Sequence, residues 1–237
     1  PEAAEAEAHP FSTEYGDHFE TPLIAYKHLR PVLCWIAKRL GKKPKELRIY
    51  DPFYCAGAVV GRMASLGFPR LIHRNEDFYR CESEGRVPAF DVLVTNPPYS
   101  LDHKERILNF CVTSGKPWAL LMPNYVATKQ YYTNLTSGGS GAPPTPFFVA
   151  PLPGSRYQYT HPEGTGHDNS PFESMWFVDA MAGKKEVMGE LSPAEGSRVM
   201  LSIADLKQAR CVRPGRRLNP RQRKAAAKRR ATLQQKQ

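Results

Sequence analysis

The sequence contains no long apolar segment and no cysteine pair of the kind that binds zinc. No apolar run approaches the roughly 20 residues of a membrane-spanning helix, and no secretory signal pattern opens the 237-residue chain. Its five cysteines are dispersed without a CxxC pair, which argues against a zinc cluster and against a disulfide framework. These absences predict a protein of a reducing, intracellular compartment (nucleus, nucleolus or cytoplasm), with no metal and no membrane partner.

Two phosphate-binding motifs are also missing. Residues 47–50 (LRIY) are predicted to form a buried strand that ends at Asp51, and residues 58–66 (AVVGRMASL) a helix. The turn between them, Cys55-Ala56-Gly57, is small enough for a ligand to approach the backbone closely. It has neither the Gly-Lys-Ser/Thr of a phosphate loop nor the three glycines of a dinucleotide fingerprint. The pattern predicts a nucleotide-type site without either phosphate motif.

The C-terminal segment lacks acidic residues. There is none after Asp205, whereas twelve residues are basic, which exceeds the formal net charge of +10 for the whole chain. Such a density of positive charge favours phosphate backbones through counterion release and reads little sequence. We therefore expect a nucleic-acid-binding tail, whose candidate contacts are Arg216, Arg217, Arg221, Arg223, Lys224, Lys228, Arg229 and Arg230. A localisation signal and a solubilising tail are the open alternatives.

The most specific motif is Asn96-Pro97-Pro98-Tyr99, which follows the apolar run 90–95 (FDVLVT). That run predicts a buried strand, and the two prolines make a stiff turn whose carbonyls lack backbone donors. An asparagine amide oxygen, a neighbouring carbonyl and an aromatic face suit a flat ring that carries an exocyclic amino group. The two acceptors would take the N–H groups of the amine, and Tyr99 would stack on the ring. The alternative is a proline turn that only closes a strand.

Two further segments belong to the same pattern. Thr21 is predicted to cap a helix that begins with Pro22. Residues 71–73 (LIH) are predicted to form a second strand, with the acidic pair Glu76 and Asp77 just past its end. A carboxylate in that place can take the ribose hydroxyls of a nucleoside, as in doubly wound folds. The open alternatives are an ordinary capped helix and a solvated acidic turn.

Taken in order, these motifs resemble the S-adenosylmethionine-dependent amino-methyltransferases of the NPPY class, which act on adenine N6. The resemblance covers about residues 19–180. It implies that Asn96, Pro97, Pro98 and Tyr99 are catalytic. It also implies a cofactor site for S-adenosyl-L-methionine formed by Thr21, Asp51, Cys55, Gly57, Glu76, Asp77 and Phe78. Cys55 stands where the family usually has glycine.

The resemblance also implies the fold class, a Rossmann-like class I methyltransferase of α/β type. We expect a mostly parallel sheet, an antiparallel C-terminal hairpin and a basic tail. The expected organisation is a flexible lead-in (1–16), a methyltransferase domain (17–205) and the tail (206–237). The strands of the hairpin are predicted at 156–159 (RYQY) and 171–178 (PFESMWFV). The irregular segments 133–155, except around Phe147 to Val149, and 161–170 are predicted to be recognition loops on the substrate side, with plain connections as the open alternative.

The expected function is S-adenosylmethionine-dependent N6-adenine methylation of nucleic acid, with RNA, such as ribosomal RNA, favoured. A DNA N6-adenine methyltransferase is the alternative enzyme. A protein glutamine methyltransferase would share NPPY, but a basic tail gives it no advantage. An alternative of another class is a nucleic-acid-binding module with a degenerate, non-catalytic pocket. The sequence leaves the target site, the oligomeric state and any protein partner open.

Overall fold

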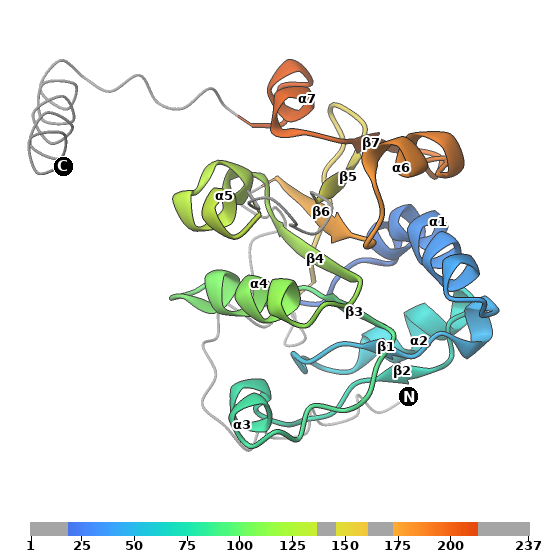
Figure 1. Ribbon diagram of the computed structural model, residues 1–237, viewed down its shortest axis with the longest axis vertical. Coiled ribbons are helices and arrows are strands. Elements are labelled where there is room, and N and C mark those ends of the chain that lie inside the picture. Colours follow the sequence, from blue (N-terminus) through green and yellow to red (C-terminus); the bar gives the residue numbers. More distant parts are fainter. Residues whose placement is uncertain (1–18, 137–145, 161–172, 213–237) are drawn as a thin grey trace, which may run out of the picture.

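The computed structural model of the protein describes residues 19–136, 146–160 and 173–212 (Figure 1). The described residues form one seven-stranded mixed sheet with helices on both faces, in the strand order β2-β1-β3-β4-β6-β5-β7. This is the α/β architecture expected from the sequence, and it is compatible with a Rossmann-like fold. The basic residues 216–230 assigned to nucleic acid lie outside the described residues, as do the lead-in 1–16 and the loop 161–170.

One half of the sheet is parallel. It consists of β1 (Ile49–Tyr50), β2 (Leu71–Ile72), β3 (Val92–Thr95) and β4 (Trp118–Pro123). Every residue of β3 and β4 is buried, which fits strands covered by helices on both faces. The described chain between β2 and β3 contains a single short helix, α3 (Phe78–Ser83). The carboxyl ends of β1, β2 and β3 therefore lie together at one edge of the parallel half, a usual place for a ligand in open α/β sheets.

The other half of the sheet is antiparallel. Strand β6 (Ser174–Asp179) lies between β4 and β5 (Phe147–Pro151), antiparallel to both, and β7 (Ser197–Met200) pairs with β5 at the outer edge. The predicted strand at 171–178 is confirmed in β6, but its predicted partner at 156–159 is wrong. The partner is β5, which lies inside the irregular segment 133–155. Residues 156–159 are not a strand, and the bridge that follows them joins Thr160 to Glu20.

Helices cover the two faces of the sheet and separate the core into two clusters. One cluster contains side chains of α1 (Leu23–Arg39), α2 (Ala58–Ser65) and α6 (Lys184–Glu190). The other contains side chains of α3, α4 (His103–Thr113), α5 (Gln130–Thr136) and α7 (Ile203–Gln208). Strand residues alternate between the clusters, as the pleat requires: Trp176 belongs to the first and Phe177 to the second. The short 3₁₀ turns are Pro44–Glu46 and Asn124–Thr128.

Two details of the chain differ from the sequence-based expectations. Pro22, not Thr21, is the N-cap residue of α1, and no side chain caps this helix. At the other end, α7 crosses the boundary expected after residue 205, and both Cys211 and Val212 are buried in the second cluster. Within the described ranges, each helix is too short or too polar to cross a membrane.

Candidate active site

A cavity of about 370 Å³ lies at the carboxyl ends of β1, β2 and β3. The elements around it are labelled in Figure 1: α2 follows β1, and α3 follows β2. Eight of the residues predicted to bind cofactor or substrate line it: Thr21, Asp51, Cys55, Glu76, Asp77, Phe78, Asn96 and Pro98. Gly57, Pro97 and Tyr99 are not among its lining residues. The structure thus brings most of the predicted site together around one volume of a size usual for small-molecule sites.

Asp51 lies in the wall of the cavity and connects the end of β1 with the end of β3. Its carboxylate accepts a hydrogen bond of 2.6 Å from the hydroxyl of Thr95, the last residue of β3, and one of 3.3 Å from the main-chain N–H of Phe53. The residue is only 5 % exposed. Burial raises the pKa of the Asp51 carboxyl, and the nearby His73 and the Thr95 hydroxyl partly oppose this rise. Asp51 is therefore a carboxyl held in place in a poorly solvated wall, whose charge a cationic ligand would stabilise.

The turn that follows Asp51 is bound by a residue that the sequence did not reveal, Glu20. Its Oε1 accepts hydrogen bonds from the main-chain N–H groups of Ala56 (3.0 Å) and Ala58 (3.4 Å), at the N-terminus of α2. Its Oε2 forms an ion pair of 2.9 Å with Arg62, which also donates to the carbonyl of Thr21. The amide groups that could bind an anion at this helix end are thus occupied by a carboxylate of the chain itself.

Cys55 and Gly57 shape the same turn. Gly57 has φ +81°, in the left-handed region, and a Cβ added there would lie 3.3 Å from the Tyr54 hydroxyl, so glycine is the residue that fits. Burial, with Glu20 nearby, raises the pKa of the Cys55 thiol to about 12. Cys55 is therefore a neutral thiol, small enough to keep the turn.

The two carboxylates after β2, Glu76 and Asp77, make different contacts. Asp77 caps α3, because its Oδ1 accepts from the N–H groups of Tyr79 (3.0 Å) and Arg80 (3.3 Å). The Glu76 side chain is 44 % exposed, and one of its oxygens lies 3.9 Å from Arg74. Phe78 is buried and packs edge-on against Phe53, with ring centroids 5.4 Å apart. Glu76 is thus the carboxylate of the pair with room for a ligand.

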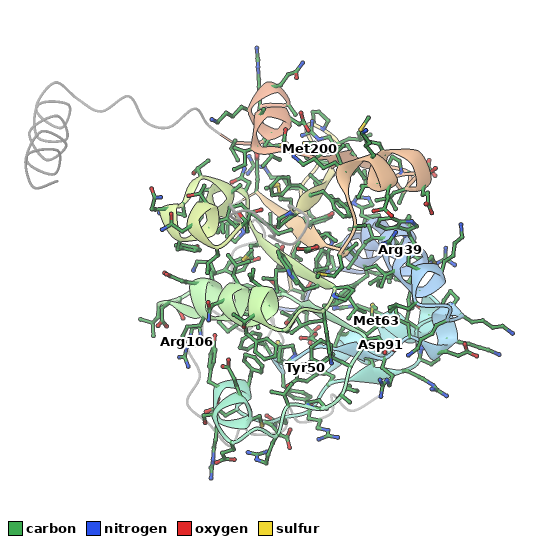
Figure 2. The ribbon with its side chains drawn as sticks, in the orientation of Figure 1. Arg39, Tyr50, Met63, Asp91, Arg106 and Met200 are labelled. Carbon is green, nitrogen blue, oxygen red and sulfur yellow. The ribbon has the colours of Figure 1, made fainter. Side chains whose placement is uncertain are left out.

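The wall beyond α3 is held by stacked side chains. The Tyr79 ring stacks on His103, the first residue of α4, with ring centroids 5.4 Å apart and a hydrogen bond of 3.1 Å between the Tyr79 hydroxyl and His103 Nδ1. The guanidinium of Arg106, a residue of α4, lies 3.5 Å from the centre of the Tyr79 ring in α3. Figure 2 labels Arg106. These contacts fix α3 against α4 and hold the cavity wall in one position.

The Asn96-Pro97-Pro98-Tyr99 turn leaves β3 directly above Asp51. Asn96 Oδ1 is buried and has no hydrogen-bond partner among the described residues. Tyr99 is held from the other side: its hydroxyl donates to the main-chain carbonyl of Leu121 in β4 (3.1 Å), and its own carbonyl accepts from Lys104. The turn, whose Asn96 and Pro98 line the cavity, therefore contains one buried acceptor without a donor among the described residues and one anchored aromatic ring.

The segment 156–160, although not a strand, also contacts this turn. The Tyr159 hydroxyl lies 2.5 Å from Ser174 Oγ in β6 and hydrogen-bonds to Tyr99. Tyr157 is buried against α1, where its hydroxyl lies 2.9 Å from His28 Nδ1. The Thr160 carbonyl accepts from the N–H of Glu20 (2.8 Å). This segment thus connects the residue at the α2 N-terminus with the aromatic side of the site.

His73 is a second residue that sequence reasoning missed. It follows β2 directly, lines the cavity and has a side chain only 2 % exposed. Its one sequence signal is a polar ring at the end of a predicted buried strand. In the described ranges, no group of three or more His, Cys, Asp or Glu side chains is arranged as a metal site.

Comparison with known proteins adds no family assignment. No protein-family model matches the chain, and a search of curated proteins finds no match. The functional argument therefore depends on the geometry of the cavity and on the motifs themselves.

Proposed function

We propose that the chain is an S-adenosylmethionine-dependent methyltransferase of class I that methylates adenine N6 in nucleic acid, with RNA the favoured substrate. The observation that carries the proposal is the buried Asn96 Oδ1. A buried acceptor without a donor costs about 1–3 kcal/mol, so a fold tolerates it best where a ligand supplies the donor. An exocyclic amine supplies such an N–H, and the neighbouring Pro97 carbonyl can take the second.

The cofactor half of the proposal is supported by Glu20. A ligand with a phosphate chain would need the amide groups at the α2 N-terminus, and a carboxylate already occupies them. Positive charge on a ligand is favoured beside the buried Asp51 carboxylate, whereas the charge of Glu20 is already paired with Arg62. S-Adenosylmethionine is a nucleoside with an ammonium and a sulfonium and no phosphate. The residues present fit it better than they fit a nucleotide di- or triphosphate.

The mixed sheet supports the same class. The expected fold has a mostly parallel sheet closed by an antiparallel hairpin, and the order β2-β1-β3-β4 followed by antiparallel β6 and β5 agrees with that expectation. In this assignment Asp51, the turn at Cys55 to Gly57, Glu76 and Phe78 hold the cofactor. Asp77 contributes indirectly, by capping α3.

When bound, the cofactor supplies a methyl group on an activated sulfonium leaving group. The chain's own residues then act mainly by positioning. Asn96 Oδ1 and the Pro97 carbonyl accept the two N–H groups of the target amine and favour a more tetrahedral nitrogen, whose lone pair can aim at the methyl carbon. Tyr99, fixed by its hydroxyl on β4, stacks on the base from beside the cavity. After transfer the amine is acidic and loses its proton easily, so no strong base is required.

The substrate half depends on the basic C-terminal residues, which lie outside the described part of the chain. Their charge favours a polyanion, and a single-stranded or looped target can present its base without the cost of flipping it out of a duplex. We therefore favour RNA over DNA, in an intracellular location. DNA N6-adenine methylation is the second candidate enzyme activity.

The test is incubation of the purified chain with cofactor labelled in the methyl group and separate pools of total RNA, genomic DNA and protein. We expect label in N6-methyladenine of RNA, and loss of that label in Asn96→Ala. Label in DNA alone would select the alternative enzyme, and label in protein glutamine would overturn the nucleic-acid substrate. Cofactor binding by calorimetry without any transfer would favour a non-catalytic nucleic-acid-binding module.

A further inference from the structure

His73 is the first residue after β2, just ahead of the acidic pair at the place where doubly wound folds usually have the carboxylate that binds ribose. β1 and β2 are parallel with Tyr50 opposite Ile72, so His73 follows β2 as Asp51 follows β1. In such folds a carboxylate about 20 residues after the first strand's turn takes a ribose hydroxyl. Here Glu76 and Asp77 lie 19 and 20 residues after Gly57, and His73 lies 16 residues after it, at the strand end itself. This chain therefore has an imidazole at the end of its second strand, ahead of the acidic pair.

The contacts of the ring fix its orientation. Nδ1 lies 3.2 Å from the main-chain carbonyl of Asp51, and because a carbonyl only accepts, Nδ1 must carry the hydrogen. One face of the ring stacks on Tyr54, with centroids 4.8 Å apart and an angle of 27° between the planes. The imidazole is thus held by a hydrogen bond and by a stacked ring, with its other nitrogen directed away from Asp51.

That other nitrogen has no partner in the part of the chain that the structure describes. Nε2 is buried, and no described group donates to it or accepts from it. Nε2 accepts a hydrogen bond in the neutral ring and donates one in the charged ring, and a hydroxyl group can complete either form. Since His73 lines the cavity, a bound ligand can supply that hydroxyl.

The two nearby carboxylates, Glu76 and Asp77, differ in how far they are free to bind a ligand together with His73. Asp77 Oδ1 already accepts hydrogen bonds from the N–H groups at the start of α3. The Glu76 side chain is 44 % exposed and lies beside Arg74. A vicinal diol would offer one hydroxyl to His73 and one to Glu76. We propose that His73 Nε2 hydrogen-bonds to one ribose hydroxyl of the nucleoside ligand, with Glu76 taking the adjacent one. This inference rests on the proposed function, because the ligand it assumes is an adenosyl cofactor.

The test uses S-adenosylhomocysteine and its 2′-deoxy and 3′-deoxy analogues, with binding measured by calorimetry. The full-length protein should bind at least one deoxy analogue roughly 10-fold more weakly than the parent, the scale of one hydrogen bond in a binding site. His73→Phe keeps a flat ring against Tyr54 but removes both nitrogens. It should bind the parent roughly 10-fold more weakly and lose the discrimination against that analogue.

Two further variants make the result specific. His73→Gln retains a polar group at the length of Nε2 and should recover part of the affinity and of the discrimination. His103→Phe is the matched control, because this second histidine of the cavity pairs with Tyr79 and should leave the discrimination unchanged. A thermal melt of each variant reports whether it is folded.

The outcomes separate the two proposals. If the wild-type chain binds S-adenosylhomocysteine but treats the deoxy analogues alike, or if folded His73→Phe and His73→Gln both discriminate as the wild type does, His73 is not the ribose contact and the proposed function stands. If the wild-type chain does not bind S-adenosylhomocysteine, the proposed function is overturned, and the assignment of His73 with it.

Discussion

Asn96→Ala should make the ligand-free protein more stable while it removes activity. The substitution deletes a buried acceptor that has no donor among the described residues, and such a group costs about 1–3 kcal/mol. Part of that gain is offset by the lost packing of the side chain, so we expect a net increase of about 1 kcal/mol in the free energy of unfolding. For a domain of this size that corresponds to a rise of roughly 2–4 °C in Tm. Methyl transfer should fall by at least ~10²-fold, as when one positioned polar group is removed from a catalytic site.

Asn124→Ala is the matched control for this experiment. Asn124 also follows directly after a strand of the sheet, but its Nδ2 donates to Glu173 and to the main-chain carbonyl of Cys211. Its removal should therefore lower Tm and leave the activity of the folded protein unchanged. Both variants are measured by urea denaturation without ligand and by transfer of labelled methyl groups at saturating substrate. A destabilised Asn96→Ala that still transfers methyl groups at a near-normal rate would refute the role of Asn96.

Four other changes test the remaining parts of the site and the tail. Asp51→Asn should weaken binding of S-adenosylmethionine, measured by calorimetry, without unfolding the protein, and unchanged affinity would remove Asp51 from the site. Tyr99→Ala should reduce turnover strongly and Tyr99→Phe only slightly, since the ring does the stacking; equal losses would mean that the hydroxyl is what matters. Burial raises the pKa of Asp179 from 3.8 to about 6 in the folded state. Between these two pH values the folded state holds a proton that the unfolded state has lost, so the contribution of this group to the free energy of unfolding increases as the pH falls through that range. Asp179→Asn should thus stabilise the protein at pH 7.5 by at most roughly 3 kcal/mol, with the gain over wild type disappearing below about pH 4 in urea denaturation; a gain independent of pH would contradict this. Deletion from Arg213, which leaves the buried Val212 in place, should make the slope of log affinity against log salt shallower by roughly 0.7 per lost contact on single strands, and an unchanged slope would assign the tail to localisation or solubility.

The parallel half of the fold could be predicted from the sequence because its strands are local patterns. Residues 90–95 are a mostly apolar run that is followed by Asn96-Pro97, and its last four residues form β3. Strands buried on both faces have this composition wherever they occur. The helix predicted at 58–66 also formed, as α2, because a small-residue turn precedes it and a glycine follows it.

The antiparallel half was predicted less well because its pairing is set by distant parts of the chain. Phe147–Pro151 is a short apolar run within a segment rich in glycine, serine and proline. The sequence set Phe147 to Val149 apart from the surrounding loop but did not predict a strand or its partners there. The run becomes β5 because β6 and β7 supply partners on both sides. The alternating pattern at 156–159 suggested a strand, but Tyr157 and Tyr159 turn instead to His28 and Ser174.

The residues of the candidate site also divide into those that belong to local motifs and those whose role depends on distant contacts. Asp51, Asn96 and the acidic pair lie in motifs whose order along the chain could be recognised. Glu20 and His73 belong to no motif of that kind, and their importance comes from burial and from contacts across elements, which a sequence does not display. The two tasks of Glu76 and Asp77 could be separated only when the structure showed Asp77 at the cap of α3.

The position of β6 between β4 and β5 determines when this protein can complete its fold during translation. β5 leaves the ribosome first, yet both of its hydrogen-bonded neighbours, β6 and β7, come later in the chain. Until Asp179 has been synthesised, the edge of β4 and the apolar strand Phe147–Pro151 both lack their partners. Unpaired apolar strands of this kind are the usual starting points of aggregation. A chain cut short before Asp179 would therefore contain the parallel half of the sheet but be a client for chaperones.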